Sequence, residues 1–453
     1  MGFSEFSLEE LVRPGGVKCD ACGKVHKCEL QFLKIGRGVI EQLPEMLETL
    51  KAKKPFMVCD ENTWKAAGER AVEILKNAGI ETVVYQVPGN HPKPSEWEVG
   101  SVVMHFDPSC DLFLAVGGGV MNDICKVLSH ATGIPNAIIG TAPSMDGYAS
   151  DSSSMEVNKV KTSLYNHAPR GILLDTDILS QAPARMLQAG FGDMIAKYIA
   201  TCEWRISNLV TGEYYCEEIA KLMRRALKRI VSSYEGIRDR DPDAIGEVAE
   251  GLVLAGIAMA YAEISRPASG LEHYFSHMWE MMALERDMPY DLHGIQVGVG
   301  TVLTMKLYEH IKTLVPDKEK ALKHLEDFDL NAWTAEVHRI FGKTADEVLK
   351  IEETARKNEP EGVKRRIDAL CEHWDEILQI IDEELPDMKE LVSMMEAIGE
   401  PTKPSDLNIS LQDTLDAFTG SREIRNKYLT SSMLWDLGVT EEFREMLKEE
   451  AEL

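Results

Sequence analysis

Residues 111–123 read DLFLAVGGGVMND, and they are central to the predicted fold of the first part of the chain. It begins with a continuous apolar run, which is typical of a strand buried on both faces. Three consecutive glycines follow, and they allow a tight turn in which the backbone approaches a ligand closely. A helix is predicted from Val120 to about Ala131, and its first amides are suited to bind a phosphate. The stretch therefore predicts a strand–turn–helix unit that holds a ligand at the turn; a tight turn alone is the simpler alternative.

The glycine turn matches neither of two common nucleotide-binding patterns. No Gly-Lys-Ser/Thr follows it, so it is not a Walker loop, and Asn122 stands where the dinucleotide fingerprint needs its third glycine. A second loop, residues 141–150 (TAPSMDGYAS), follows the next predicted strand. Both loops should lie at the carboxyl edge of the sheet, where ligands bind in open α/β folds. The Asp146 carboxylate and nearby hydroxyls are suited to hold a polyol there, although a surface turn would explain the same residues.

Strand and helix patterns alternate around this centre. Predicted strands cover residues 55–59, 82–87, 111–116, 136–140 and 171–174. Such alternation predicts a parallel sheet covered on both faces. Beyond Leu179 helical periods dominate, as in residues 217–235, 243–262, 271–283 and 294–308. We therefore expect an α/β domain over residues 1–178 and an all-helical domain over residues 179–453, with charged surface helices over 317–384.

Composition narrows the class of protein. The 453 residues include 49 Lys and Arg against 75 Asp and Glu, which gives a net charge of −26. Proteins that bind nucleic acid or an anionic membrane surface normally carry a basic face, so neither partner is expected. The longest apolar stretch, residues 251–262, falls short of the roughly 20 residues that span a bilayer. The acidic N-terminus lacks a secretory pattern and the nine cysteines fit a reducing compartment, so a cytoplasmic protein is expected.

A set of metal ligands is spread over the second part of the chain. Asp193 lies near a predicted helix start, His273 and His277 share one helix face, and His293 opens another helix. A carboxylate and neutral imidazoles suit a divalent transition metal, and three such ligands leave positions open for a substrate oxygen. The zinc-protease pattern fails because Tyr274 stands where it needs glutamate. The alternative is that these histidines are ordinary packed or surface residues.

Four more potential ligands stand close together at the N-terminus. Residues 19–28 read CDACGKVHKC, and Cys19, Cys22, His26 and Cys28 resemble one half of a small zinc knuckle. No second cysteine pair follows, and four ligands in ten residues are crowded for one tetrahedral ion. A hairpin with unbound thiols is the simpler interpretation, so we place this cluster outside the active site.

Taken in order, the motifs resemble the metal-dependent polyol dehydrogenase superfamily, which includes glycerol dehydrogenase, dehydroquinate synthase and iron-type alcohol dehydrogenases. The glycerol-1-phosphate dehydrogenase branch carries GGG-x-x-x-D, T-x-P-S-x-D-G-x-A-S and G-x-G-D patterns like those at residues 117–123, 141–150 and 190–193. Further matches are RPASGLEHYFSH at 266–277, HGIQVG at 293–298, GEPT at 399–402 and IRNKY at 424–428. The stretch 317–384 is longer than this branch usually carries. The resemblance implies a Rossmann-like, dehydroquinate synthase-like sheet domain followed by a helical domain.

By position, the resemblance also implies a nicotinamide cofactor and one divalent metal, Zn²⁺, Ni²⁺ or Fe²⁺. The metal ligands would be Asp193, His273 and His293. Asp146, Asp193 and His277 would contact the substrate, and Asp146 and His277 would be the catalytic groups. Asp60 would accept from the adenosine ribose and repel a 2′-phosphate, which favours NAD over NADP. The rest of the cofactor would be held by Gly117, Gly118, Gly119, Val120, Met121, Asn122, Asp123, Thr141, Ala142, Pro143, Ser144 and Ser150.

The implied reaction is the reversible reduction of dihydroxyacetone phosphate, a phosphorylated triose, to sn-glycerol 1-phosphate by NAD(P)H, a step in phospholipid metabolism. The resemblance also implies a homodimer or larger homo-oligomer. Two alternatives share the scaffold: a glycerol or other polyol dehydrogenase, and a dehydroquinate synthase-like cyclase. A catalytically idle metal- or nucleotide-binding protein is the alternative from another class. The candidates for binding the substrate phosphate are Arg170, Lys161, Lys197 and Arg266, and the sequence does not rank them.

Overall fold

The computed structural model describes residues 2–89, 91–158 and 160–452. The chain packs as two compact units. Unit 1 comprises Met1–Met194, Cys216–Ala268 and Ala397–Gly399, and unit 2 comprises Ile195–Tyr215, Ser269–Glu396 and Glu400–Leu453. These units follow packing, whereas the expected boundary at residue 178 follows the change from mixed to helical sequence, and that boundary stays a prediction.

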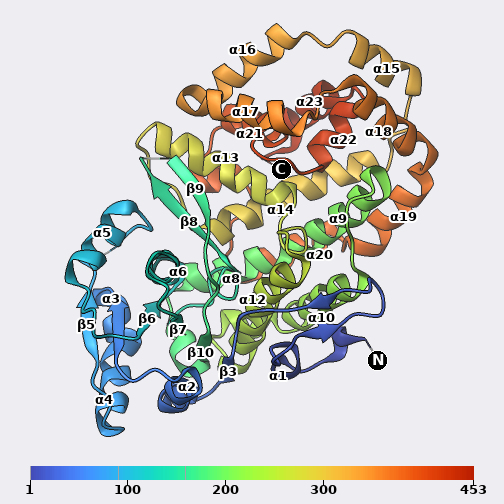
Figure 1. Cartoon of the computed structure of the whole chain (residues 1–453). Coiled ribbons are helices and arrows are strands. Elements are labelled where there is room, and N and C mark those ends of the chain that lie inside the picture. The colour runs from blue at the N-terminus through green and yellow to red at the C-terminus, as the bar shows by residue number, and fades with distance from the viewer. Residues whose placement is uncertain (1, 90, 159, 453) are drawn as a thin grey trace. The chain divides into compact units, whose positions relative to one another are not determined.

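Unit 1 is built on a six-stranded parallel sheet of order β3-β10-β7-β6-β4-β5 (Figure 1). Its strands are β3 (Phe32–Gly36), β4 (Pro55–Cys59), β5 (Val83–Gln86), β6 (Leu112–Gly117), β7 (Asn136–Gly140) and β10 (Gly171–Asp175). The α/β fold class with a helical C-terminal region is thereby confirmed. The sequence pattern does not predict β3, because its five residues FLKIG carry a lysine between the apolar positions.

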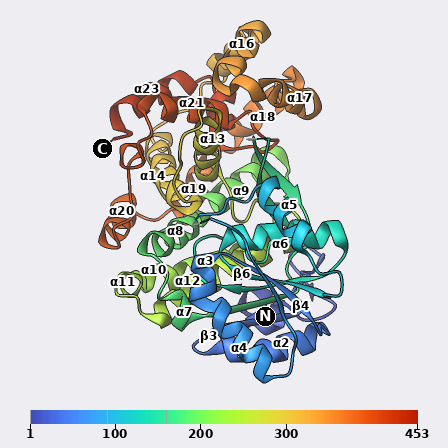
Figure 2. The same cartoon turned by 90° about the vertical axis from the view of Figure 1, so that its left-hand side faces the viewer.

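Helices cover both faces of the sheet, as its apolar strands require. On one face α2 (Leu43–Leu50) and α4 (Glu69–Asn77) bury Leu47 and Leu75 against strand side chains such as Leu114. Figure 2 shows α6 (Gly119–Thr132) on the other side of the strands, where it contacts α5 (Glu96–His105). Every residue of β6 is buried, which explains its uninterrupted apolar sequence.

Two antiparallel strand pairs and further helices complete unit 1. The pairs are β1 (Val17–Lys18) with β2 (Val25–His26), and β8 (Ser152–Val157) with β9 (Val160–Tyr165). The polar residues from Ser152 onward form β8, a strand that the sequence pattern does not predict. The remaining elements are η1 (Phe3–Glu5), α1 (Leu8–Leu11), η2 (Val39–Gln42), α3 (Glu61–Thr63), η3 (Trp64–Gly68), α7 (Thr176–Leu179), α8 (Ala184–Ile195), α10 (Glu217–Ser232), α11 (Tyr234–Arg238) and α12 (Pro242–Ala262).

Helix α12 corrects the expectation that no segment is long and apolar enough to span a bilayer. It has 21 residues and a window of mean hydropathy 1.5, and it alone among the described helices passes that test of length and composition. The uninterrupted apolar run in the sequence is shorter than α12 because Glu247 and Glu250 lie within the helix. Both carboxylates pair with Arg229. Within unit 1, 72% of the window is buried, with α10, α7 and β3 packed against the helix. A helix that is buried on many sides in a protein core has such an apolar sequence, so the sequence does not require a membrane.

The described part of unit 2 is helical. Its elements are α9 (Lys197–Thr211), α13 (Leu271–Glu285), α14 (His293–Ile311), α15 (Lys318–Glu326), α16 (Leu330–Phe341), η4 (Gly342–Thr344), α17 (Ala345–Ala355), α18 (Pro360–Glu372), α19 (Trp374–Glu384), α20 (Met388–Ala397), η5 (Pro404–Leu407), α21 (Leu411–Ser421), α22 (Thr430–Asp436) and α23 (Thr440–Glu450). Helices α13 and α14 pack along one another, and α21 packs on α13. In the charged stretch 317–384, Leu325 of α15 and Ile367 of α18 share a small core, so these helices are amphipathic as predicted.

Candidate active site

The two loops predicted to bind the ligand start side by side. Strands β6 and β7 pair with Gly117 opposite Gly140, and the Thr141 amide donates to the Gly117 carbonyl oxygen at 3.1 Å. Gly117 has φ +159°, and a Cβ there would lie 2.6 Å from Met121 Cγ, so the position requires glycine. Helix α6 begins at Gly119, and its N-cap, Gly118, offers no capping side chain. The positive end of this helix therefore opens at the carboxyl edge of the sheet, an arrangement suited to a phosphate.

Two helices clamp the loop of residues 141–150 through glycines. A Cβ on Gly190 of α8 would lie 1.8 Å from the Pro143 carbonyl oxygen. A Cβ on Gly256 of α12 would lie 2.9 Å from the Ala149 Cβ. Neither position tolerates a side chain, because helix and loop backbones approach too closely. The first glycine of the G-x-G-D motif thus serves packing and sets α8 against the loop.

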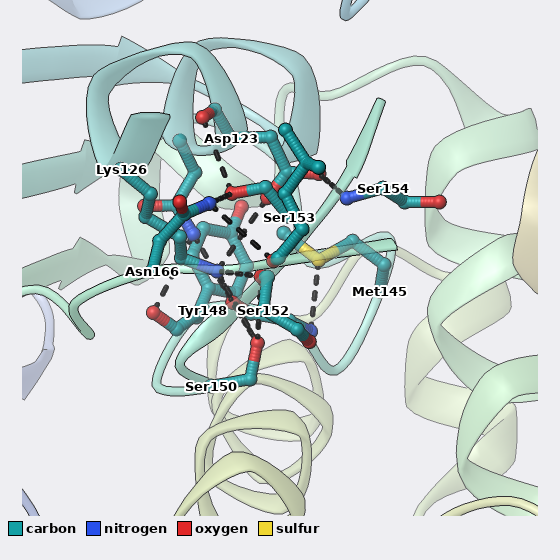
Figure 3. A network of polar contacts seen from close by, with 12 residues as sticks. Asp123, Lys126, Met145, Tyr148, Ser150, Ser152, Ser153, Ser154 and Asn166 are labelled. Carbon is teal, nitrogen blue, oxygen red and sulfur yellow. Dashed lines mark hydrogen bonds and ion pairs between the residues drawn. The ribbon is translucent and has the colours of Figure 1, made fainter. Parts of the chain in front are cut away.

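A buried lysine fastens this loop to α6 (Figure 3). Lys126 is fully buried, and its Nζ donates to the carbonyl oxygens of Gly147 at 2.6 Å and Ser152 at 2.9 Å. It also donates to Ser150 Oγ at 3.2 Å and lies 3.5 Å from Asp123 Oδ1. These contacts give the buried ammonium group the hydrogen-bond partners that a buried charge requires. Sequence reasoning missed Lys126, although its place three residues after Asp123 puts both on one helix face.

Asp123 and Asn122 bind the same segment from α6. Asp123 Oδ2 accepts from the Ser154 amide at 3.0 Å, and Asn122 Nδ2 donates to the Gly147 carbonyl oxygen at 3.1 Å. Asn122 therefore joins the two loops, which explains an asparagine where the dinucleotide fingerprint has glycine. Burial raises the pKa of Asp123 and lowers the pKa of Lys126, while their mutual attraction opposes both shifts. Asp123 thus has a structural partner besides its predicted place in the cofactor site.

Two of the predicted substrate and metal residues meet within unit 1. The Asp146 amide donates to Asp193 Oδ2 at 2.8 Å. Asp193 is fully buried on α8, and Asp146 is half-buried in the loop. A buried carboxylate oriented by a backbone amide is a suitable metal ligand.

Asp60 follows β4 and caps the next helix. Its Oδ1 accepts from the amides of Asn62 at 2.8 Å and Thr63 at 2.9 Å, at the N-terminus of α3. Capping alone accounts for an aspartate here. Because β4 is the neighbour of β6 in the sheet, Asp60 lies on the same carboxyl edge as the glycine turn. Its contact with an adenosine ribose stays a prediction.

Two predicted metal ligands lie close together in unit 2. The ring centroids of His273, in the first turn of α13, and His293, at the start of α14, are 5.3 Å apart. His273 Nδ1 lies 2.7 Å from Glu272 Oε1, and His293 Nδ1 lies 2.9 Å from Ser276 Oγ. A carboxylate only accepts, so the His273 proton sits on Nδ1 and a metal would bind through Nε2. Such an acidic partner is common behind metal-binding histidines.

His277 completes the group of histidines. Its ring is stacked at 5.4 Å on His293, and its centroid is 6.5 Å from that of His273. His277, His293 and the buried Glu280 place ligand atoms within 4.8 Å of one another. Sequence reasoning missed Glu272 and Glu280, although Glu280 stands three residues after His277 on one helix face. The three histidines therefore converge within unit 2, whereas Asp193 belongs to unit 1.

The four candidates for binding the substrate phosphate differ in their position in the fold. Arg170 directly precedes β10 and lies at the amino edge of the sheet, where it donates to the Glu29 carbonyl oxygen at 3.3 Å. That edge is opposite the loops, so Arg170 is a poor candidate. Arg266 in unit 1 and Lys197 in unit 2 are both buried, and Lys161 lies on β9.

Comparison with known proteins gives concordant matches. A family profile described as iron-containing alcohol dehydrogenase matches residues 34–183. Glycerol-1-phosphate dehydrogenase (NAD(P)+) of Halalkalibacterium halodurans is 29% identical over 399 residues, which cover 87% of this chain and 89% of the relative. The enzyme of the same name from Methanosarcina acetivorans is 35% identical over 277 residues, which cover 60% of this chain and 75% of the relative.

Solved structures match the fold at low sequence identity. The crystal structure of glycerol dehydrogenase from Schizosaccharomyces pombe superposes with a TM-score of 0.61 at 16% identity and covers 93% of this chain and 91% of that one. At this identity the likeness concerns the fold.

Proposed function

Since this chain belongs to the glycerol-1-phosphate dehydrogenases of the iron-containing alcohol dehydrogenase family, we propose that it catalyses the reversible, NAD(P)H-dependent reduction of dihydroxyacetone phosphate to sn-glycerol 1-phosphate. The observation that carries this proposal is the relationship to enzymes of that name over most of the chain. The glycine turn, the clamped loop and the cluster of histidines supply the parts that such a reaction needs.

The cofactor's place is supported by the edge of the sheet in unit 1. The uncapped start of α6 suits the pyrophosphate, and Gly117 and Gly118 let it approach the backbone. The loop from Thr141 to Ser144 starts beside this turn. Asp60 on the same edge would accept from the ribose hydroxyls and repel a 2′-phosphate, so NAD is proposed as the preferred cofactor.

The metal's place is supported by the donor set. The Nδ1 atoms of His273 and His293 are hydrogen-bonded to residues of unit 2, so Nε2 of each ring would be the ligand atom. Asp193 supplies a buried carboxylate. A carboxylate with two imidazoles fits Zn²⁺, Ni²⁺ and Fe²⁺. We propose Asp193, His273 and His293 as ligands, with Zn²⁺ or Ni²⁺ as the native ion.

When bound, the nicotinamide supplies the hydride and the metal polarises the substrate carbonyl as a Lewis acid. The protein's own residues position the reactants and move a proton. Lys126 and Asn122 fix the loop that carries Asp146, so that its carboxylate is placed to hold a substrate hydroxyl. His277, stacked on His293, is proposed to donate the proton that the product oxygen gains.

An assay of NADH oxidation on metal-stripped protein tests this function. The protein is reloaded with Zn²⁺, Ni²⁺ or Fe²⁺ and offered dihydroxyacetone phosphate, dihydroxyacetone or no substrate. We expect turnover only with metal and a kcat/KM much higher for the phosphate ester. Equal rates on the two substrates would indicate a polyol dehydrogenase, and NADH binding without turnover on any carbonyl would indicate a catalytically idle protein.

The cellular setting follows from the proposed reaction. We propose a cytoplasmic homodimer or larger homo-oligomer whose product enters phospholipid synthesis. Sedimentation of the purified protein tests the oligomer, and a monomer at assay concentration would contradict it.

A further inference from the structure

The N-terminal hairpin gathers three of the sulfur and imidazole groups that the active site does not use. Strands β1 and β2 pair with Val17 opposite His26, and Cys19 directly follows β1. In the turn between them the Cys19 amide donates to the Lys24 carbonyl oxygen at 2.9 Å. Cys22 Sγ lies 3.3 Å from His26 Nε2. The hairpin alone thus supplies three ligand atoms.

The fourth comes from far along the chain. Cys216 is the N-cap of α10, and this helix packs against η1 at the N-terminus within unit 1 (Figure 1). Cys216 Sγ lies 3.7 Å from Cys19 Sγ and 3.9 Å from His26 Nε2. The ligand atoms of Cys19, Cys22, His26 and Cys216 all lie within 4.8 Å of one another. Cys28 does not belong to this group, which removes the crowding that made the sequence motif hard to interpret.

We propose that Cys19, Cys22, His26 and Cys216 bind a structural zinc ion. Zinc–sulfur bonds of about 2.3 Å and zinc–nitrogen bonds of about 2.0–2.1 Å in a tetrahedron place neighbouring ligand atoms about 3.5–3.8 Å apart. The observed separations of 3.3 Å (Cys22 Sγ to His26 Nε2), 3.7 Å (Cys19 Sγ to Cys216 Sγ) and 3.9 Å (Cys216 Sγ to His26 Nε2) bracket that range. A disulfide would need sulfurs about 2.05 Å apart. Three soft thiolates with one imidazole favour zinc over harder cations.

The imidazole is held as a zinc ligand should be. His26 Nδ1 lies 2.7 Å from the Tyr261 carbonyl oxygen, which only accepts, so the ring proton sits on Nδ1 and Nε2 faces the thiols. The ring is stacked on Tyr261 at a centroid distance of 5.3 Å, and Phe3 packs edge-on against it. A carbonyl that fixes the tautomer of a metal-binding histidine is a recurrent second partner. This contact is independent of the thiol geometry and points to the same ligand.

Burial indicates a structural site. Cys19, His26 and Cys216 are at most 2% exposed, and Cys22 is half-buried. Four protein ligands leave no open position for a substrate, which is typical of structural zinc. The ion would join the N-terminal hairpin to α10 and to the end of α12. It would thereby fasten a two-stranded hairpin that is too small to be stable alone.

The test compares zinc content per chain in three proteins purified under reducing conditions: wild type, Cys216→Ser and the control Cys28→Ser. We expect Cys216→Ser to lose one equivalent of zinc that wild type and Cys28→Ser retain. Titration of wild type with p-hydroxymercuribenzoate should release that equivalent to a chromogenic chelator. Equal zinc content in all three proteins, or a Cys19–Cys216 disulfide in the mass spectrum of freshly purified protein, would overturn the proposal.

A second measurement covers the case in which Cys216→Ser does not fold. Wild-type protein loaded with Co²⁺ should show a thiolate-to-cobalt charge-transfer band in the near ultraviolet. The proposed catalytic ligands include no thiolate, so that site cannot produce the band. Its absence at saturating Co²⁺ would overturn the proposal, whatever the dehydrogenase assay shows.

Discussion

Single buried side chains determine how the loops of unit 1 are held. The Lys126 amino group is buried and donates hydrogen bonds to three oxygens of the segment from Gly147 to Ser152. The sequence indicated the glycine turn and Asp146, because such residues follow strands in recognisable patterns. It gave no comparable signal for Lys126 or Cys216, whose partners are set by tertiary packing. Residues of this kind are found only once the chain is folded.

Replacing Lys126 tests the first of these contacts. Lys126→Met leaves Asp123 buried without its cation and the loop carbonyls without their donor. Breaking one partner of a buried pair costs on the order of 3–5 kcal/mol in the free energy of unfolding. Urea denaturation measures the loss, with the exposed Lys76→Met as the control, which should change by less than about 0.5 kcal/mol. Unchanged stability of Lys126→Met would show that the amine is not needed to hold the loop.

The carboxylate behind His273 makes a second prediction at this scale. Glu272→Gln removes the charge that holds the proton on His273 Nδ1, so metal affinity should fall about 10–100-fold. Zn²⁺ competition titrations measure the change in affinity. Glu309→Gln, an exposed change on α14, serves as the control. If both variants bind metal like wild type, Glu272 does not orient a ligand.

Helices and strands were largely predictable, and their packing was not. Five of the six sheet strands and the main helices of unit 2 follow from apolar periodicity, because burial on two faces or one face leaves that pattern. The β8–β9 hairpin escaped prediction because its sequence is mostly polar. The sequence also does not explain why Gly190 of α8 is a glycine, because its close approach to Pro143 is a long-range contact.

Gly190→Ala tests that approach. The added Cβ would lie 1.8 Å from the Pro143 carbonyl oxygen, so helix or loop must move. Such overpacking costs about 1–3 kcal/mol, and the displaced loop should also raise the Kd for NADH. Gly100→Ala in α5 is the matched control, because its Cβ meets nothing within 4 Å and should stabilise the helix by about 0.5–1 kcal/mol. Thermal unfolding separates the two, and equal Tm values would contradict the packing argument.

At the scale of the whole molecule, Asp193 belongs to unit 1, whereas His273 and His293 belong to unit 2. The relatives confirm the family resemblance stated from the sequence, whereas the metal-ligand set stays a proposal. The compact units are interleaved in sequence, because residues 195–215 pack with unit 2 and residues 216–268 return to unit 1. The change in composition along the sequence does not show which segments pack together in one unit.

The most direct measurement is the Zn²⁺ dependence of NADH oxidation with dihydroxyacetone phosphate in wild type, Asp193→Asn and His273→Ala. His310→Ala on α14 serves as the control, and circular dichroism verifies that each variant is folded. We expect wild type and His310→Ala to regain full activity as Zn²⁺ is added, and the two ligand variants to stay inactive at every concentration. Full activity of metal-free His273→Ala would contradict the proposed catalytic metal.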